Sequence, residues 1–341
     1  MAKRTNRRIV LVKRPEGEVT PDCMRLAEEP APEPGEGEAL VRNLYLSLDP
    51  TQQGWMKYDT YLPAIPIGDV IRSAGVGEVV ESRSPLYAKG QLVNGLVGWQ
   101  EYTIADGAGR RMQSVPAGIS AVDAVSVFGI TGLTAYFGLL DVGKPKPGET
   151  VVVSGAAGAT GSVVGQIAKL SGCRVVGIAG SDDKCRWLTG ELGFDACVNY
   201  RKEDVGEALR RACPKGIDVY FDNVGGAILD AALLQLSRNA RVALCGAIST
   251  YGEKEPPPGP RHLMQLVLKH AHMEGFLVLD YVARFPEAIA AMTQWVAEGK
   301  LKNRVDVVDG LENAPAAFQR LFTGGNTGKL LVRVASNGDV G

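Results

Sequence analysis

From about residue 150 the chain alternates short apolar runs with glycine-containing turns and segments of helical periodicity. Such alternation is typical of parallel strands joined by crossover helices, because each connection must pass back over the sheet. We therefore expect an α/β fold with a doubly wound, Rossmann-type parallel sheet. The apolar runs are VVVSG (151–155), RVVGIAG (174–180), ACVNY (196–200), IDVYFD (217–222) and ARVALCG (240–246).

The first third of the chain has a different texture. Short apolar stretches are separated by Gly- and Pro-bearing turns, which predicts a β-rich domain. A length of 341 residues also suggests about two domains. The last apolar run, LLVRV, resembles the N-terminal texture, so we expect it to return to the first domain. The expected domains are 1–127 with 302–341, and 128–301.

Composition excludes some functions. Apolar residues make up 45% and charged residues 22%, as in ordinary globular proteins, and the net charge of −1 offers no field for nucleic acid or an anionic membrane. No apolar run reaches the roughly 18 residues of a membrane span. The basic start could be a mitochondrial address, but Glu16 and Glu18 follow closely, so we expect a cytoplasmic protein.

Metal ligands are sparse. The six cysteines are widely spaced without a CxxC pair, and the three histidines, His262, His270 and His272, all lie late in the chain. Structural and catalytic zinc sites need clustered ligands. We therefore expect no metal, and cysteines that are reduced.

The turn after the first strand reads Ala156-Ala157-Gly158-Ala159-Thr160-Gly161. It resembles the GxGxxG fingerprint, with Ala156 where the first glycine would stand. Backbone N–H groups at a helix start bind a diphosphate when no side chain intervenes, so residues 158–161 are the expected cofactor cradle. The alternative is a bare strand–helix turn in an unrelated α/β protein. The cradle residues are Gly158, Ala159, Thr160 and Gly161.

The end of the second strand bears on the choice of cofactor. An NAD enzyme usually places an acid there for the ribose 2′-OH, but this chain has Gly180, with Lys184 one helical turn beyond the following serine. A small residue beside a cation suits the 2′-phosphate of NADPH, which we favour. Asp182 and Asp183 could take the acid's role, or could simply cap the helix.

Eight segments together resemble one known family. It is the zinc-free leukotriene B4 12-hydroxydehydrogenase/prostaglandin reductase family of the medium-chain dehydrogenase/reductase superfamily. The segments occur in order over nearly the whole chain, which makes the match far more specific than the glycine turn alone. They are NLYLSLDP (43–50), GDVIRSAGVGEVVES (68–82), GWQEYTI (98–104), FGITGLTAYFGL (128–139), AAGATGSVVGQIAKL (156–170), FDNVGG (221–226), CGAISTY (245–251) and GGNTGK (324–329).

The resemblance implies a GroES-like catalytic domain, a Rossmann domain and an active cleft between them. It also implies NADPH-dependent reduction of the C=C bond of α,β-unsaturated ketones or aldehydes, without a metal, usually in a homodimer. By residue, it implies Lys184 and Tyr200 at the 2′-phosphate. The other implied cofactor residues are Asn223, Cys245, Gly246, Ala247, Ile248, Ser249, Tyr251, Phe276, Leu277, Val278 and Asn326. The alternatives are purely structural: Tyr200 is a surface aromatic, Cys245 a small buried residue and 276–278 a core strand.

For the chemistry we expect Tyr251 to donate a hydrogen bond or proton as charge develops on the substrate carbonyl. Alternatively Tyr251 only lines the pocket, and a cofactor hydroxyl or water is the donor. Tyr45, Trp55 and Tyr61 are the expected apolar walls for the substrate. The rival functions are a quinone reductase of the same superfamily and a non-catalytic NADPH-binding protein.

Overall fold

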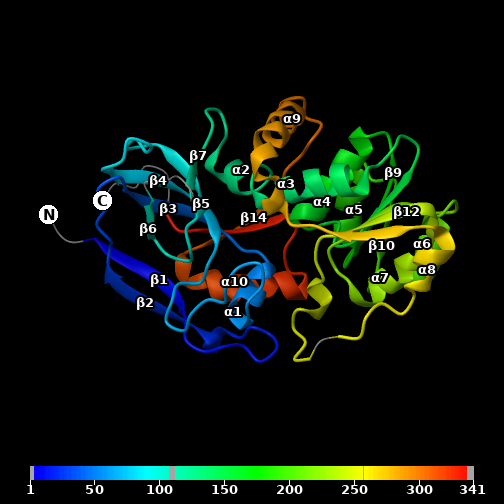
Figure 1. The fold of residues 1–341 in the computed structure, drawn as a ribbon, viewed down its shortest axis with the longest axis horizontal. Coiled ribbons are helices and arrows are strands. Elements are labelled where there is room, and N and C mark those ends of the chain that lie inside the picture. The colour runs from blue at the N-terminus through cyan, green and yellow to red at the C-terminus, as the bar shows by residue number, and fades with distance from the viewer. Residues whose placement is uncertain (1–3, 107–111, 256, 336–341) are drawn as a thin grey trace. The chain divides into compact units, whose positions relative to one another are not determined.

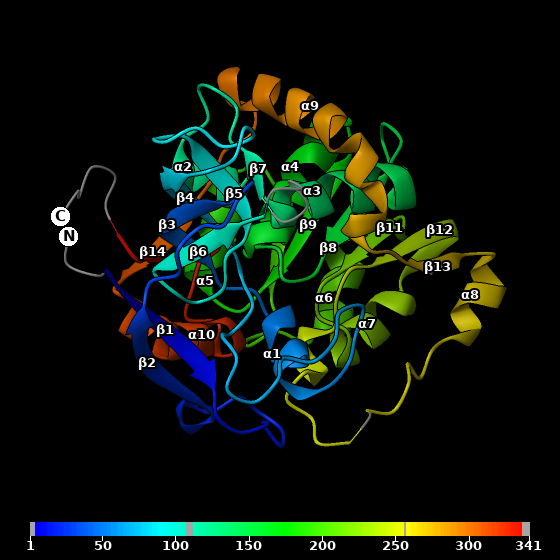
Figure 2. The ribbon, with the colours of Figure 1, turned by 60° about the vertical axis from the view of Figure 1, so that its left-hand side comes forward.

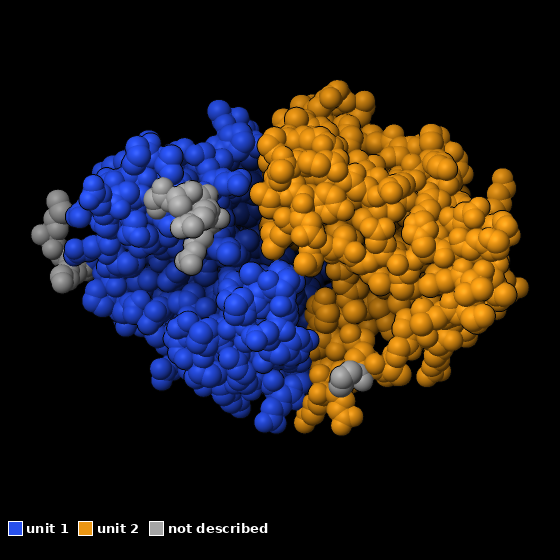
Figure 3. Space-filling model, viewed as in Figure 1, with its two compact units in different colours: residues 1–126, 305–341 blue, residues 127–304 orange. Residues whose placement is uncertain are grey.

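The computed structural model describes residues 4–106, 112–255 and 257–335. The chain divides into two compact units, which Figure 3 shows in different colours. Unit 1 combines residues 1–126 with 305–341, and unit 2 is residues 127–304. No helix in the described part of the chain is long and apolar enough to cross a membrane.

Unit 2 contains a six-stranded parallel sheet of order β10-β9-β8-β11-β12-β13. This is the doubly wound order of a Rossmann domain, with the reversal between its two halves at β8 and β11. The central strands β8 and β11 are rich in apolar residues and almost entirely buried, as a sheet covered on both faces requires. The strands are β8 (Thr150–Val153), β9 (Arg174–Ala179), β10 (Ala196–Asn199), β11 (Ile217–Asp222), β12 (Leu236–Leu244) and β13 (His272–Gly275).

Helices cover both faces of this sheet. α4 and α5 lie over one face and α6 and α7 over the other (Figures 1 and 2). Local signals fix their ends: the Ser181 hydroxyl accepts from the Lys184 amide at 3.3 Å, and Asp204 accepts from the Glu207 amide at 2.9 Å. The helices are α4 (Ala159–Leu170), α5 (Asp182–Gly190), α6 (Val205–Ala212), α7 (Gly226–Leu233) and α8 (Met264–Lys269).

Before the sheet, residues 119–143, whose sequence predicts helix, form three helical pieces. Ser120 caps the first piece, since its hydroxyl accepts from the Asp123 amide at 3.1 Å. The pieces are α2 (Ala121–Val125), α3 (Ile130–Phe137) and the π-helical η2 (Gly138–Gly143).

The sequence of the run MEGFLVLDY (273–281) predicts a strand throughout, and this prediction is wrong in its second half. β13 ends at Gly275 and the 3-10 helix η4 (Val278–Arg284) follows, leading into α9 (Phe285–Ala297). A short apolar run does not by itself distinguish a strand from a helical turn. Among the described residues β13 pairs with β12 alone, so it forms the edge of the sheet.

Unit 1 is the predicted β-rich domain. Its main sheet has the order β14-β15-β3-β4-β5-β7, with β6 also paired to β3. β15, near the end of the chain, pairs antiparallel with β3, so the last strand completes the N-terminal unit. The strands are β3 (Ala39–Ser47), β4 (Ala74–Ser82), β5 (Leu92–Leu96), β6 (Tyr102–Ala105), β7 (Met112–Ser114), β14 (Val305–Asp309) and β15 (Lys329–Arg333).

Three further elements complete unit 1. A separate hairpin pairs β1 (Thr5–Leu11) with β2 (Met24–Pro30). Two helices contribute to the core, α1 (Thr51–Lys57) through Trp55 and Met56, and α10 (Ala314–Thr323) through Phe318. The doubly wound sheet and the separate β-rich unit are the fold class that the sequence predicts.

Candidate functional site

The predicted cofactor residues of unit 2 meet at one edge of its sheet. All six strands are parallel, so their carboxyl ends share that edge, where open α/β sheets bind ligands. The structure places each predicted segment directly after a strand. These segments are 156–161 after β8, 180–184 after β9, Tyr200 after β10, Asn223 after β11, 245–251 after β12 and 276–278 after β13.

The glycine-rich turn leaves no room for side chains. A Cβ added to Gly161 would lie 2.4 Å from the Gly155 carbonyl oxygen and 2.8 Å from the Ala156 Cα. Gly155 has the left-handed φ of 57°, while the buried Ala156 donates its N–H to Ile178 O at 3.0 Å. The conformational role of the missing glycine is therefore taken one residue earlier, which explains why alanine is tolerated at 156.

α4 begins directly after this turn. Gly158 is its N-cap, and residues 159–161 form its first turn. Amides in the first turn of a helix have no acceptor within the helix, and the helix dipole makes them attractive to anions. A side-chain-free approach to these amides fits the diphosphate of a dinucleotide.

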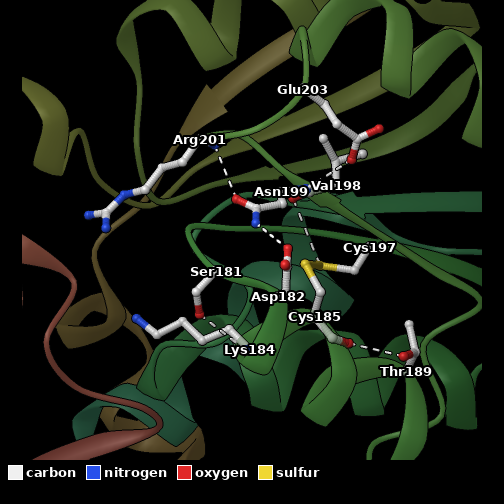
Figure 4. Close-up of a disulfide and its surroundings, with 10 residues drawn as sticks. All are labelled: Ser181, Asp182, Lys184, Cys185, Thr189, Cys197, Val198, Asn199, Arg201 and Glu203. Atoms are coloured by element: carbon white, nitrogen blue, oxygen red, sulfur yellow. Dashed lines mark hydrogen bonds between the residues drawn. A yellow bond between two sulfur atoms is a disulfide. The ribbon is translucent and has the colours of Figure 1, made fainter.

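Cations gather after β9 and β10. A Cβ on Gly180 would lie 2.8 Å from the Tyr200 hydroxyl oxygen, so the Tyr200 side chain packs against that glycine. Burial lowers the pKa of Lys184, and the positive charge of Arg201 lowers it further. In Figure 4 the side chains of Lys184 and Arg201 extend toward the same side. Arg201 was missed in the sequence, although it directly follows Tyr200.

The two aspartates at the start of α5 have other partners. Asp182 accepts from Asn199 Nδ2 at 2.6 Å and forms an ion pair with Lys202, and these two contacts lower the pKa of its carboxyl. Asp183 pairs with Arg186 on its own helix. A ribose 2′-OH would have to compete with these contacts for either carboxylate, which supports the choice of NADPH over NADH.

A buried carboxylate that the sequence analysis missed holds the turns at this edge. Asp222 is 1% exposed and accepts from Ser154 Oγ at 2.8 Å, Tyr220 Oη at 3.0 Å and the Gly225 amide at 3.1 Å. Burial, together with the charge of Asp222, raises the pKa of Tyr220 well above its usual value. One side chain therefore links the ends of β8 and β11.

Asn223 belongs to the same network. Its side-chain amide donates to Ser154 O at 2.7 Å and its backbone N–H donates to Ser154 Oγ at 2.8 Å. The next loop is attached through backbone groups, since the amides of Cys245 and Gly246 both donate to Asp222 O, at 2.9 and 3.0 Å. Three successive loops are thereby held in one arrangement.

Tyr251 folds back over the loop that carries it. It follows the 3-10 turn η3 (Ile248–Thr250), and its hydroxyl accepts from the Ala247 amide at 3.3 Å. Ser249 is held separately, since its hydroxyl donates to Val224 O at 2.6 Å. Burial raises the pKa of the Cys245 thiol to about 12, so Cys245 is a neutral packing residue and no nucleophile.

Residues 276–278 lie after β13 with different environments. The Phe276 ring packs edge-on against Phe221, with ring centroids 6.2 Å apart. Val278 is buried, whereas Leu277 is exposed. Asn326 lies in unit 1, in the loop between α10 and β15, where its side-chain amide donates to Gly328 O at 3.2 Å.

Two of the three expected substrate-pocket residues are neighbours in unit 1. The rings of Trp55 and Tyr61 meet edge to face with centroids 6.0 Å apart, and the Arg72 guanidinium lies 5.6 Å from the Trp55 ring. Tyr61 is 44% exposed, with its hydroxyl oxygen 3.1 Å from Thr51 Oγ1. Tyr45 instead packs against a separate cluster that includes Leu44 and Ala121 to Val125.

The expectation that all cysteines are reduced is wrong for one pair. Cys185 on α5 and Cys197 on β10 form a disulfide, with their Cα atoms 5.3 Å apart (Figure 4). They are 12 residues apart in the sequence, and only the packing of α5 beside β10 brings them together. The described residues contain no group of three or more His, Cys, Asp or Glu side chains that could hold a metal.

The comparisons with known proteins agree with this geometry. Residues 7–113 match the family model described as the N-terminal domain of oxidoreductase, and residues 159–294 match the one described as zinc-binding dehydrogenase. NADPH-dependent curcumin reductase of Escherichia coli is 46% identical over 98% of this chain and 99% of its own length. Prostaglandin reductase 1 of Rattus norvegicus is 41% identical over 95% and 97%.

A solved structure is equally similar. The crystal structure of CurA in complex with NADPH from Vibrio vulnificus superimposes with a TM-score of 0.92 at 43% identity, covering 97% of this chain and 99% of that one. The fold and site thus define a two-domain oxidoreductase. The chain belongs to the medium-chain dehydrogenase/reductase superfamily, in its zinc-free leukotriene B4 12-hydroxydehydrogenase/prostaglandin reductase family. The second family model is described as zinc-binding, but the described residues of this chain contain no cluster of side chains that could hold a zinc ion.

The Asp222 network gives a testable prediction. Asp222→Asn replaces an acceptor oxygen with a donor beneath the cofactor edge, and loss of a charge-assisted hydrogen bond is expected to raise the Kd for NADPH about tenfold or more. The matched control is Asp218→Asn at the opposite end of the same strand, where Asp218 accepts from the Thr150 amide at 2.8 Å. Fluorescence titration gives each Kd, and thermal unfolding gives each loss of stability.

We expect both variants to lower the melting temperature, and only Asp222→Asn to weaken NADPH binding. Equal NADPH affinities for the two variants would contradict the role given to Asp222.

Proposed function

We propose that this protein uses NADPH to reduce the C=C bond of α,β-unsaturated ketones and aldehydes. The observation that carries the proposal is full-length similarity to reductases of such compounds. These relatives are NADPH-dependent curcumin reductase, prostaglandin reductase 1, the 2-alkenal reductase of Nicotiana tabacum and the (+)-pulegone reductase of Mentha piperita. The last two are 41% and 39% identical to this chain.

We assign the 2′-phosphate of NADPH to Lys184 and Arg201, with Tyr200 beside them. The partly desolvated Lys184 is held near a second cation, which lowers its pKa, so an arriving phosphate dianion relieves the repulsion and pairs with both. Gly180 keeps the position open, and the Asp182 carboxylate is engaged by Asn199 and Lys202. NADH lacks the phosphate and gains nothing from these cations.

Lys184→Met tests the phosphate assignment. Removing one charge-assisted contact is expected to raise the Kd for NADPH about 10- to 100-fold, while the Kd for NADH stays within about twofold. The matched control is Lys169→Met, near the carboxyl end of α4, where the lysine pairs with Asp195 at 2.8 Å. Calorimetric titration measures all four affinities. Parallel weakening of NADPH and NADH binding would remove Lys184 from phosphate recognition.

Bound NADPH supplies a hydride from its nicotinamide to the β-carbon of the enone. Negative charge then develops on the substrate carbonyl oxygen, which a hydrogen-bond donor stabilises as the enolate. We place Tyr251 in this role, because its hydroxyl is positioned by the Ala247 amide at the end of β12 and a phenol donates while remaining uncharged. We assign Trp55 and Tyr61 to the substrate pocket, where both would contribute an aromatic ring and Tyr61 also a hydroxyl group.

Tyr251→Phe tests that role while keeping the ring. Loss of a donor to the developing oxyanion typically costs 10²- to 10³-fold in kcat, so we expect a fall of about 100-fold with an enone substrate. Tyr61→Phe serves as the control, with an effect expected mainly on KM. An unchanged kcat for Tyr251→Phe would leave Tyr251 as a pocket wall, with a cofactor hydroxyl or water as donor.

The reaction class is tested with a substrate panel. Purified protein and NADPH are offered a medium-chain enone, its saturated ketone and a p-quinone, and oxidation of NADPH is followed by absorbance. We expect turnover of the enone with the saturated ketone as product, and none of the saturated ketone itself. Turnover of the quinone alone would indicate a quinone reductase, and binding of NADPH without any turnover would indicate a non-catalytic protein.

We further propose a homodimer formed through the β13 edge of unit 2. Exposed apolar side chains gather on and near α8, where Met264, Val267 and Leu268 are each more than 60% exposed. Within the part of the chain that the structure describes, β13 pairs with β12 on one side and leaves its other edge open. An open strand edge beside an apolar patch favours association with a second copy of this chain.

Val267→Glu is expected to convert the dimer into monomers, because a charge would be buried in the interface. Leu26→Glu, at an exposed apolar position of β2 in unit 1, is the control. Sedimentation equilibrium distinguishes the two states, and a monomeric wild type would contradict the proposal.

We also propose a cytoplasmic location, which subcellular fractionation tests.

A further inference from the structure

The disulfide between Cys185 and Cys197 lies on the surface of unit 2. Both residues are half-buried and line a hollow of about 270 Å³, together with Arg186, Thr189 and Glu203. Their Cα separation of 5.3 Å lies within the range that a disulfide spans without backbone movement. A small thiol in solution therefore has a path to the sulfur atoms.

The other cysteines of unit 2 have different environments. Burial raises the pKa of the Cys173 and Cys213 thiols to about 11 and that of Cys245 to about 12. The thiolate is the form that exchanges, so these three are inert near neutral pH. Cys185 and Cys197 are therefore the cysteines of unit 2 that are available for thiol–disulfide exchange.

The same pair connects the two elements that carry the phosphate-binding cations. Cys185 directly follows Lys184 in the first turn of α5. Cys197 lies in β10, which ends at Asn199 and leads straight into Tyr200 and Arg201. Figure 4 shows the disulfide bridging α5 and β10, with Lys184 and Arg201 extending away from it. Reduction removes this covalent link, so that α5 and β10 become free to move apart.

Non-covalent contacts across the same junction limit that separation. Asn199 donates to Asp182 at 2.6 Å, and Lys202 pairs with the same carboxylate. Reduction is therefore expected to loosen the arrangement of Lys184 and Arg201 without unfolding α5. NADPH binding to the reduced form then loses more conformational entropy, because Lys184 and Arg201 must be ordered again around the phosphate.

We propose that Cys185 and Cys197 are a site of reversible thiol–disulfide exchange with low-molecular-weight thiols, and that the bridged form binds NADPH more tightly than the reduced form. This inference rests on the proposed assignment of the 2′-phosphate to Lys184 and Arg201. NADH, which lacks that phosphate, binds both forms alike.

The exchange is balanced as follows. A thiolate attacks one sulfur of the bridge, the Cys185–Cys197 bond breaks, and the departing cysteine takes up a proton. A second thiolate attacks the outer sulfur of the mixed disulfide and releases the other cysteine, which is also protonated. Overall, two small thiols are oxidised to one small disulfide and the protein disulfide is reduced to two thiols. A small-molecule disulfide such as oxidised glutathione drives the reverse reaction.

The test compares two preparations of the wild-type protein. One is incubated with oxidised glutathione and the other with dithiothreitol that is then removed without oxygen, and alkylation followed by mass spectrometry counts the free thiols. The Kd values for NADPH and NADH are then measured by calorimetry. We expect the bridged form to bind NADPH about three- to tenfold more tightly, the range given by ordering one long side chain, with the Kd for NADH unchanged.

Cys185→Ser is the matched variant, since it removes the bridge and keeps a small polar side chain. We expect its NADPH affinity to equal that of the reduced wild type under both treatments. Reciprocity adds a second readout, because saturating NADPH should make the bridge harder to reduce by the same factor and saturating NADH should not. This readout uses the wild type alone, so the test stands even if the variant fails to fold.

Three outcomes would overturn the inference: free thiols at both positions after glutathione treatment, equal NADPH affinity of the two wild-type forms, or equal shifts for NADPH and NADH. The phosphate assignment itself fails separately, if the fully bridged protein shows no preference for NADPH over NADH.

Discussion

The loops at the carboxyl edge of the parallel sheet of unit 2 are held in place by one buried carboxylate, between β8 and β11 where the strand order reverses. Asp222 is inaccessible to water, so each of its acceptor positions must be met by a donor, and those donors come from the ends of β8 and β11. Its backbone oxygen also receives two amides of the loop after β12. A parallel sheet brings strand ends to one edge, and this residue turns that proximity into a fixed arrangement of loops. Gly161 lets α4 pack directly against the backbone of Gly155 and Ala156, which brings the first turn of the helix to the end of β8.

We attribute selectivity for NADPH to the charges beside that edge. Two cations, Lys184 and Arg201, are held close enough for one to lower the pKa of the other, while the nearby acid Asp182 forms an ion pair with Lys202. In this proposal the two cations bind the 2′-phosphate, and no free carboxylate is offered to a ribose hydroxyl. The disulfide at Cys185 joins the helix and the strand that carry these cations, which is the structural basis of the proposed redox control over NADPH affinity.

Local and periodic features of this structure were predictable from the sequence. Alternating apolar runs predict the parallel sheet, Ser181 and Ser120 cap the helices they precede, and the segments after the strands fall at the cofactor edge. What failed needed three-dimensional information. The apolar run after Gly275 is compatible with both a strand and a 3-10 turn, and its pattern does not decide between them. The Cys185–Cys197 contact, the burial of Asp222 and the separation of Tyr45 from Trp55 all depend on how whole elements pack, which local sequence does not show.

Hydride transfer from NADPH to the β-carbon of an enone can be followed with NADPH that carries deuterium at C4 of the nicotinamide, on the transferred face, and a simple alkenone in ordinary water. Proton and deuterium NMR of the product then locate the label. We expect a saturated ketone with one deuterium on the β-carbon and an unlabelled hydrogen on the α-carbon. Deuterium on the carbonyl carbon of an allylic alcohol would show that the protein reduces the carbonyl group instead.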